Sequence, residues 1–319
     1  MLQRFGAKLR FEIERMVNRL LALLPRAAMS DAEMHAVLAE HPPLFIVGAP
    51  RTGSTALYQI LTQVFDVGYI DNLAAHLYGN LAFGLKLSRA LGGQGAHDCF
   101  ESDLGDTSGG GWRAPHECGE FWYRWLSRVD HFVDDGDITP AMAAALRQEV
   151  AAATQALGRP LVFKNLNVGQ RLRLIRAALP EARILYCRRE QAFTVQSILA
   201  AREKLRWPEH ALWSVRPREW RELESLPLLP QVAGQVVALE RQIEADLGRF
   251  PMEQVQAVDY ERWMESPAAA LDGVAALTGW PRRVTGVHRP EIRSINHIRD
   301  AARMAEIERA LIGAKQARP

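Results

Sequence analysis

The sequence predicts a three-layer α/β fold with a central parallel sheet. Short, continuous apolar runs, typical of strands that are buried on both faces, occur at 44–47, 161–163, 184–187 and 255–258. Stretches with helical spacing of their apolar residues separate these runs. Strands that alternate with helices are typical of parallel sheets covered by helices on both sides.

The composition is that of an ordinary globular protein and excludes several classes. The chain has 319 residues, of which 48% are hydrophobic and 24% charged, and its formal net charge is +2. This charge lacks the basic excess of a duplex-binding protein, so we expect no nucleic-acid partner. The three cysteines form no CxxC pair, so we expect no metal site and a cytoplasmic location. No apolar run reaches about 18 residues, so we expect no transmembrane span.

Residues 1–42 are predicted to form an N-terminal helical extension. Apolar residues recur at helical spacing over 10–24, with arginines on the opposite side. This helix either packs on the main body or makes a peripheral contact with a membrane surface or a partner. Ser30 and Glu33 form a capping box that predicts a short second helix before His41.

Residues 43–319 are predicted to form a single domain. Thr139-Pro140 opens an alanine-rich helix that Gly158 closes. Two stretches interrupt the alternation: 92–111, rich in Gly, Asp and Ser, is expected to be a flexible surface loop, and 205–230 is an irregular, aromatic-rich insertion. The remaining helices are expected after the first strand and at 168–178, 191–203, 231–248 and 261–277.

The first strand runs into a glycine turn that predicts an anion site. The spacing Gly48-x4-Gly53-Ser54-Thr55, followed by a helix, directs backbone N–H groups at a bound anion. It differs from the P-loop pattern GxxxxGK[ST] because Ser54 replaces the lysine, while Arg51 supplies a cation inside the loop. A small-molecule kinase or nucleotidase would lack a phosphate contact here and would have only Asp259 for magnesium. A glycine turn without any ligand is the other alternative.

This loop resembles the 5′-phosphosulfate loop of sulfotransferases that use 3′-phosphoadenylyl sulfate (PAPS), including bacterial members. The resemblance rests on Pro50-Arg51-Thr52-Gly53-Ser54-Thr55-x-Leu57. It implies a P-loop-like fold, PAPS as the co-substrate and no metal. It also implies that the residues from Arg51 to Thr55 bind the donor.

A second motif of the family follows the strand at 184–187. Arg189 comes just after this strand and Ser197 follows eight residues later. In the family such a pair holds the 3′-phosphate of the donor, and an arginine offers a fork of N–H donors to phosphate oxygens. The residues between them usually read Asp-Pro, whereas this chain has Glu190-Gln191. Solvated surface charge is the alternative interpretation of these arginines.

The resemblance also identifies Lys164, at the end of the strand 161–163, as a cation for the leaving phosphate. In the cytosolic branch of the family a histidine two residues later removes the acceptor proton, but this chain has Leu166 there. The usual histidine base is therefore absent.

A replacement base is expected in Pro115-His116-Glu117-Cys118-Gly119-Glu120-Phe121, which is similar to a segment of bacterial members. Glu117 is the first candidate, followed by His116 and Glu120, because a carboxylate suits a general base. Glu120 could instead pair with Arg124 on a helix. Asp71 and His76 are further candidates.

The acceptor could be a hydroxyl or amine of a glycan, a lipid or a metabolite. Trp112, Trp122, Trp125 and Trp207 either form a stacking wall for it or belong to the core. A basic segment near the C-terminus either closes over the 3′-phosphate or is a solvated face; it comprises Arg282, Arg283, Arg289, Arg293, Ser294 and His297. A non-catalytic nucleotide-binding protein is the third functional alternative.

Overall fold

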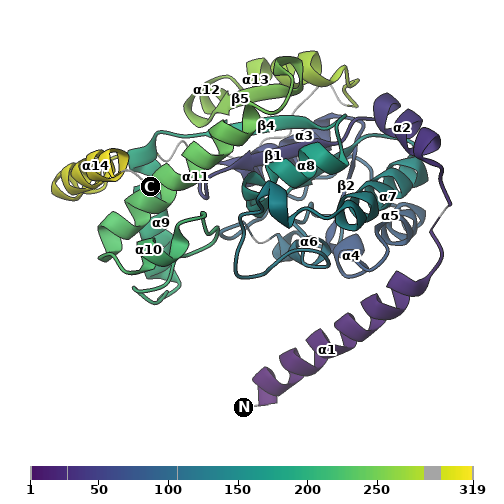
Figure 1. Ribbon diagram of the computed structural model, residues 1–319, viewed down its shortest axis with the longest axis horizontal. Coiled ribbons are helices and arrows are strands. Elements are labelled where there is room, and N and C mark those ends of the chain that lie inside the picture. Colours follow the sequence, from purple (N-terminus) through teal and green to yellow (C-terminus); the bar gives the residue numbers. More distant parts are fainter. Residues whose placement is uncertain (1, 27, 106, 284–295, 318–319) are drawn as a thin grey trace.

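Five parallel strands form the central sheet in the order β2-β3-β1-β4-β5 (Figure 1). The computed structural model describes residues 2–26, 28–105, 107–283 and 296–317. The strands pair in parallel throughout this sheet, which confirms the predicted fold class. They are β1 (Leu44–Gly48), β2 (Gly68–Tyr69), β3 (Leu161–Lys164), β4 (Arg183–Arg188) and β5 (Val255–Asp259).

Side chains of each strand alternate between two cores, one on each face of the sheet. Phe45 and Val47 pack with helices of one layer, and Leu44 and Ile46 pack with helices of the other. The first layer contains α2 (Asp31–Glu40), α5 (Leu81–Ala90), α7 (Pro140–Leu157) and α8 (Leu172–Ala178), and the second contains α3 (Ser54–Val64), α12 (Tyr260–Glu265) and α13 (Pro267–Thr278).

A third core holds three helices together beside the sheet. It joins α9 (Gln191–Lys204), α11 (Leu228–Leu247) and α14 (Ala301–Gln316). Helix α14 was not predicted from the sequence, because it lies far along the chain from the strand pattern. Short helices complete the described chain: α4 (Asn72–Ala75), α6 (Gly119–Trp122), α10 (Trp220–Glu224), and the 3-10 turns η1 (Ser108–Gly110), η2 (Asp135–Asp137), η3 (Leu166–Gln170) and η4 (Met252–Gln254).

The helix caps that were predicted from the sequence are present, but one predicted helix is not continuous. Ser30 and Glu33 make the reciprocal capping box of α2, and α7 begins after Thr139 and ends at Gly158. The expected single helix over 261–277 is wrong. It is two helices, because Pro267 has no N–H to continue the hydrogen-bond ladder of α12 and instead opens α13.

Part of the 92–111 segment is buried, which corrects the expectation of a loop lying wholly on the surface. Gln94, His97 and Thr107 are each less than 5% exposed. The Gln94 side chain bonds both backbone polar groups of Tyr69 on the edge strand β2. The His97 ring lies 2.8 Å from the Thr62 hydroxyl. The buried polar groups of the loop are therefore satisfied by the body of the protein.

The N-terminal helix α1 (Leu2–Leu23) projects from the body (Figure 1). Among the residues whose side chains are described, Ile13, Met16, Val17, Leu20 and Leu24 are exposed, so the expectation that this apolar face packs on the main body is wrong. No helix in the described part of the chain combines the length and hydrophobicity needed to cross a bilayer.

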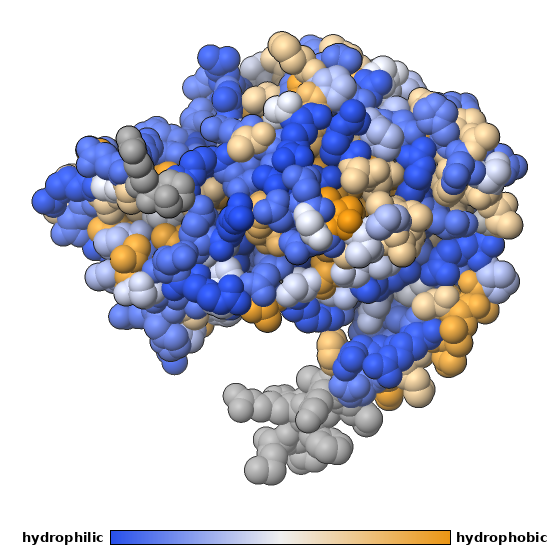
Figure 2. Space-filling view, viewed as in Figure 1, coloured by the Kyte–Doolittle hydropathy of each residue, from blue (hydrophilic) through white to orange (hydrophobic). Residues whose placement is uncertain are grey.

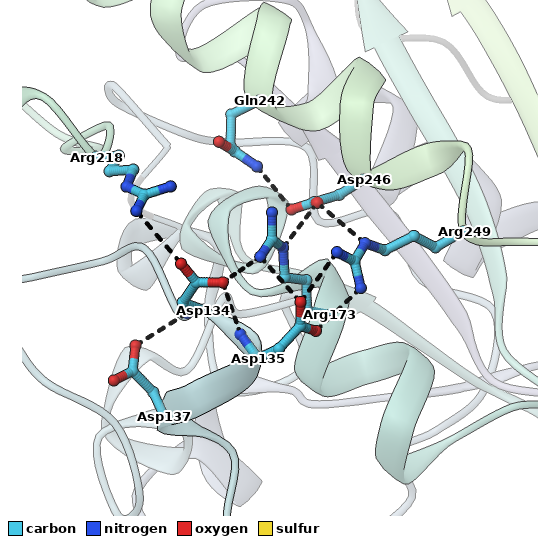
Figure 3. A network of polar contacts seen from close by, with 8 residues as sticks. All are labelled: Asp134, Asp135, Asp137, Arg173, Arg218, Gln242, Asp246 and Arg249. Carbon is cyan, nitrogen blue, oxygen red and sulfur yellow. Dashed lines mark hydrogen bonds and ion pairs between the residues drawn. The ribbon is translucent and has the colours of Figure 1, made fainter. Parts of the chain in front are cut away.

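An ion-pair network fixes the segment before α7 (Figure 3). Arg173 of α8 contacts Asp134 and Asp135, and it also contacts Asp246 of α11. Arg249 binds Asp135 in addition. Asp246 is 1% exposed, and its carboxylate is paired as a buried charge must be. The network ties 134–137 to two helices of the body.

Candidate active site

The loop between β1 and α3 is held in a shape that leaves a helix N-terminus open. Arg51 and Gly53 both have left-handed backbone conformations, with φ of 71° and 77°. A Cβ on Gly53 would lie 2.5 Å from the Tyr260 ring, so only glycine fits between the loop and α12. Among the described residues, no side chain caps α3. Its first N–H groups can therefore bind an anion.

A cavity of about 1060 Å³ opens at the carboxyl ends of the strands, next to this helix terminus. This is the usual place for ligands in an open α/β sheet. Its walls come from the β1–α3 loop, the end of β3, α9, the 102–105 segment and the 212–216 segment.

Arg189, which is buried, half-buried Arg51 and Ser197 form one end of the cavity. Arg51 Nε donates to Ser197 Oγ at 3.1 Å, and Arg189 Nη1 donates to the Arg51 carbonyl oxygen at 2.9 Å. The Arg189 guanidinium also stacks on the Tyr260 ring, 4.6 Å from its centroid. The structure thus brings together three residues that the sequence analysis took from two separate motifs.

These two arginines are cations without a carboxylate partner among the described residues. Burial lowers the pKa of Arg51 and of Arg189, because desolvation disfavours the charged form. A buried cation is costly unless an anion or several acceptors satisfy it. Arg189 Nε finds a neutral acceptor, Asn296 Oδ1 at 2.8 Å. The electrostatics of this end of the cavity therefore favour an anionic ligand.

Lys164, Thr55 and Glu117 meet where β3 ends and α3 begins. Lys164 is 2% exposed, its Nζ donates to Thr55 Oγ1 at 3.0 Å, and it forms an ion pair with Glu117. Gly105 covers this cluster, since a Cβ there would lie 3.1 Å from Glu117 Oε1. A carboxylate and an ammonium group thus lie side by side at the open end of a helix.

The other proposed bases lie outside the cavity lining. His116 Nδ1 accepts the Cys118 N–H at 2.8 Å. Both carboxylate oxygens of Glu120 are bound by Arg128, one of them at 2.7 Å. The suggested pairing of Glu120 with Arg124 is wrong, because the four-residue α6 is too short to bring these two side chains together.

Asp71 and His76 also have partners elsewhere. Asp71 caps α4 by accepting the Ala74 N–H at 2.8 Å, and it is fully buried. Burial raises the pKa of its carboxyl. His76 lies 3.1 Å from Glu14 of α1 and is 70% exposed. Neither residue lines the cavity.

Of the four tryptophans expected either to form a stacking wall for the acceptor or to belong to the core, some follow each alternative. Trp122 is buried in the core and Trp125 packs against it. Trp112 is exposed and lies outside the cavity lining. Trp207 lines the cavity, as does Trp213, which the sequence analysis had placed only in the insertion.

Several residues on the side of the cavity away from the arginine pair were missed. Tyr123, Arg128, His131, Asn167 and Arg216 line it there. They come from three segments that are far apart in the chain, 123–131, η3 and the insertion, and no spacing rule links these segments. The one available signal was the aromatic and basic content of the insertion.

His131 joins the first of these segments to the insertion at the cavity wall. Its Nδ1 accepts the Arg216 N–H at 2.9 Å. Burial lowers the pKa of His131 to about 4, so the ring is neutral near pH 7.

The C-terminal basic segment is only partly described. Arg282 and Arg283 form ion pairs with Asp272 and Asp66 outside the cavity. His297 uses its carbonyl oxygen to accept from Gln196. The other members, Arg289, Arg293 and Ser294, lie outside the described residues.

One family model matches most of the chain. The model of the Sulfotransferase family matches residues 42–283. Similar solved structures include a sulfotransferase of Mycobacterium tuberculosis (14% identity, 78% of this chain and 73% of that chain covered, TM-score 0.45). Others are from Mycobacterium avium (13%, 90% and 74%, TM-score 0.44) and Alicyclobacillus acidocaldarius (16%, 85% and 96%, TM-score 0.43). No curated protein sequence matches the chain.

Proposed function

The chain belongs to the sulfotransferase family, and from that premise we propose that it transfers a sulfuryl group from PAPS to a hydroxyl or amine acceptor. The observation that carries the proposal is that Arg51 and Arg189, which have no carboxylate partner among the described residues, converge on one cavity with an open helix N-terminus and a lysine–glutamate pair.

The donor fits the anion-binding end of the cavity. The backbone N–H groups of Gly53, Ser54 and Thr55, with Thr52 shaping the turn through its bond to the Ala49 carbonyl oxygen at 2.9 Å, would hold the 5′-phosphosulfate. Arg189 and Ser197 would bind the 3′-phosphate. Arg51 precedes α3 by three residues and donates to Ser197 at 3.1 Å, so it would be able to contact either anionic end of the nucleotide.

Transfer in this proposal is a single in-line displacement at sulfur. The acceptor oxygen or nitrogen forms a bond to sulfur while the bond from sulfur to the bridging oxygen of the 5′-phosphate breaks. The electron pair of that bond stays on the phosphate oxygen, where Lys164 and the N–H groups of α3 stabilise the developing charge. The products are adenosine 3′,5′-bisphosphate and the sulfated acceptor.

Glu117 is the proposed general base. Its carboxylate lies beside Lys164 and lines the same cavity, and it would accept the proton that the acceptor loses. His116 and Glu120 are weaker candidates because neither lines the cavity and each already has a partner, the Cys118 N–H and Arg128 respectively.

Two measurements test the function. Adenosine 3′,5′-bisphosphate should raise the melting temperature, since a ligand present at 100 times its Kd stabilises the native state by about 2.7 kcal/mol. PAPS carrying labelled sulfate should then transfer label to an acceptor in pooled cell extract, and Arg51→Ala should abolish the transfer. A melting shift with magnesium ATP alone would instead support a kinase or nucleotidase. Binding of the bisphosphate without transfer to any acceptor would support a non-catalytic protein.

A further inference from the structure

Helix α1 carries an apolar face that nothing in the described structure covers. Figure 2 shows hydrophobic side chains along one side of this helix and hydrophilic ones along the other. Leu20 is 59% exposed and Leu23 is 80% exposed. The other exposed members of this face are Ile13, Met16, Val17 and Leu24.

The opposite side of α1 is fixed to the body by polar contacts. Asn18, which is 3% exposed, donates to the His76 carbonyl oxygen at 2.9 Å and accepts the Gly79 N–H at 2.7 Å. Glu14, one turn earlier, lies 3.1 Å from the His76 ring. Successive residues of a helix are rotated by about 100°, so Leu20 points about 160° away from Asn18. The docking contacts therefore hold the apolar face outward.

The charge of α1 identifies what this face fits. The helix has five basic and two acidic residues, a net charge of +3, whereas the whole chain has +2. Arg19 is exposed and Arg15, which pairs with Glu12, is half-buried; both lie on the polar side that borders the apolar face. A second copy of the chain would bring two such basic helices together, which like-charge repulsion disfavours. An anionic surface would attract them.

We propose that α1 is an interfacial helix that binds the protein to an anionic lipid surface. Its apolar side chains enter the boundary between headgroups and acyl chains, and its arginines lie at the level of the lipid phosphates. The helix lies in the membrane plane rather than crossing it, and its docked side keeps the α/β body on the aqueous side. This inference does not depend on the proposed sulfuryl transfer.

Co-sedimentation of the full chain with vesicles tests the proposal. The chain should bind vesicles that contain 30% phosphatidylserine in phosphatidylcholine and should bind pure phosphatidylcholine far more weakly. Leu20→Glu should lower the partition coefficient about tenfold or more. It removes a leucine that would be buried in the bilayer and places a charge in the apolar layer. The double variant Arg15→Gln, Arg19→Gln should weaken binding about fivefold for each charge removed.

Ala22→Glu is the matched control, because Ala22 is exposed on the polar side and the charge change is the same. It should retain most of the binding, and circular dichroism should show all variants folded. Three results would overturn the proposal: no binding to the anionic vesicles, equal losses for Leu20→Glu and Ala22→Glu, or a lipid-independent dimer that Leu20→Glu dissociates.

Discussion

At the residue scale, Lys164 and Glu117 hold opposite charges in direct contact at the point where the sulfuryl group is proposed to move. Lys164 also reaches the Thr55 hydroxyl in the first turn of α3. The same ammonium group can therefore contact the donor phosphate and the proposed base. Each of these residues is placed by a different element, so their roles can be separated by substitution.

Glu117→Gln should lower kcat by about 10²–10⁴-fold, because the amide cannot accept the acceptor proton. Its size matches the carboxylate, so the melting shift with adenosine 3′,5′-bisphosphate should persist. Glu120→Gln is the control, since Glu120 binds Arg128 and does not itself line the cavity. Unchanged turnover in Glu117→Gln would rule Glu117 out as the base.

Arg189→Ala should weaken binding of adenosine 3′,5′-bisphosphate by roughly 10–100-fold, as expected for the loss of a charge-assisted hydrogen bond to phosphate. The neighbouring Arg188→Ala is a close control, because Arg188 pairs with Asp259 outside the cavity lining. Calorimetric titration of both variants measures the difference. Equal losses at the two positions would indicate a general charge effect and not a site.

At the element scale, the site depends on how α12 packs against the β1–α3 loop. Tyr260 begins α12, contacts the loop at Gly53 and lies under Arg189. This one ring therefore supports both the anion loop and the arginine above it.

Gly53→Ala should destabilise the fold and also abolish nucleotide binding. The left-handed conformation costs a residue with a Cβ about 1–2 kcal/mol, and the added methyl would push Tyr260 from beneath Arg189. Gly158→Ala shares the first effect only, because Gly158 has φ of 61° but nothing within 4 Å of a Cβ. Urea denaturation and nucleotide titration of both variants should separate strain from loss of the site. Normal nucleotide affinity in Gly53→Ala would contradict this account.

At the scale of the whole molecule, buried histidines make stability depend on pH. Burial lowers the pKa of His131 from its usual 6.5 to about 4, and the same cause lowers the pKa of His97 to about 4. Between pH 4 and pH 6.5 the unfolded chain therefore binds more protons than the native state. Stability is complete above pH 6.5 and falls as the pH drops toward 4.

His131→Asn should remove its share of this dependence. Asparagine can still accept the Arg216 N–H, but it does not titrate. Relative to the variant, the wild-type protein should lose about 3 kcal/mol of unfolding free energy between pH 7 and pH 4. Urea denaturation across this pH range measures the difference, and a constant difference would show that His131 is not buried as a neutral ring.

The carboxyl-end location of the site was predictable because it follows from strand order along the chain. Strands at 44–47, 161–163 and 184–187 each end next to a residue of the proposed site, and parallel strands end at one edge. The helix caps at Ser30 and Thr139 were equally readable, since capping depends on residues three positions apart. The break at Pro267 and the helix α14 were missed, because apolar spacing alone did not reveal them.

The sequence by itself determined the α/β class and predicted the anion loop and the cations near it, because strand patterning and loop motifs are local along the chain. Only the tertiary structure decided that Arg51 meets Ser197, that Lys164 meets Glu117 and that the apolar face of α1 points outward. Each of these depends on contacts between segments that are distant in the chain. Burial and charge pairing in the folded state choose such contacts, and no local pattern encodes them.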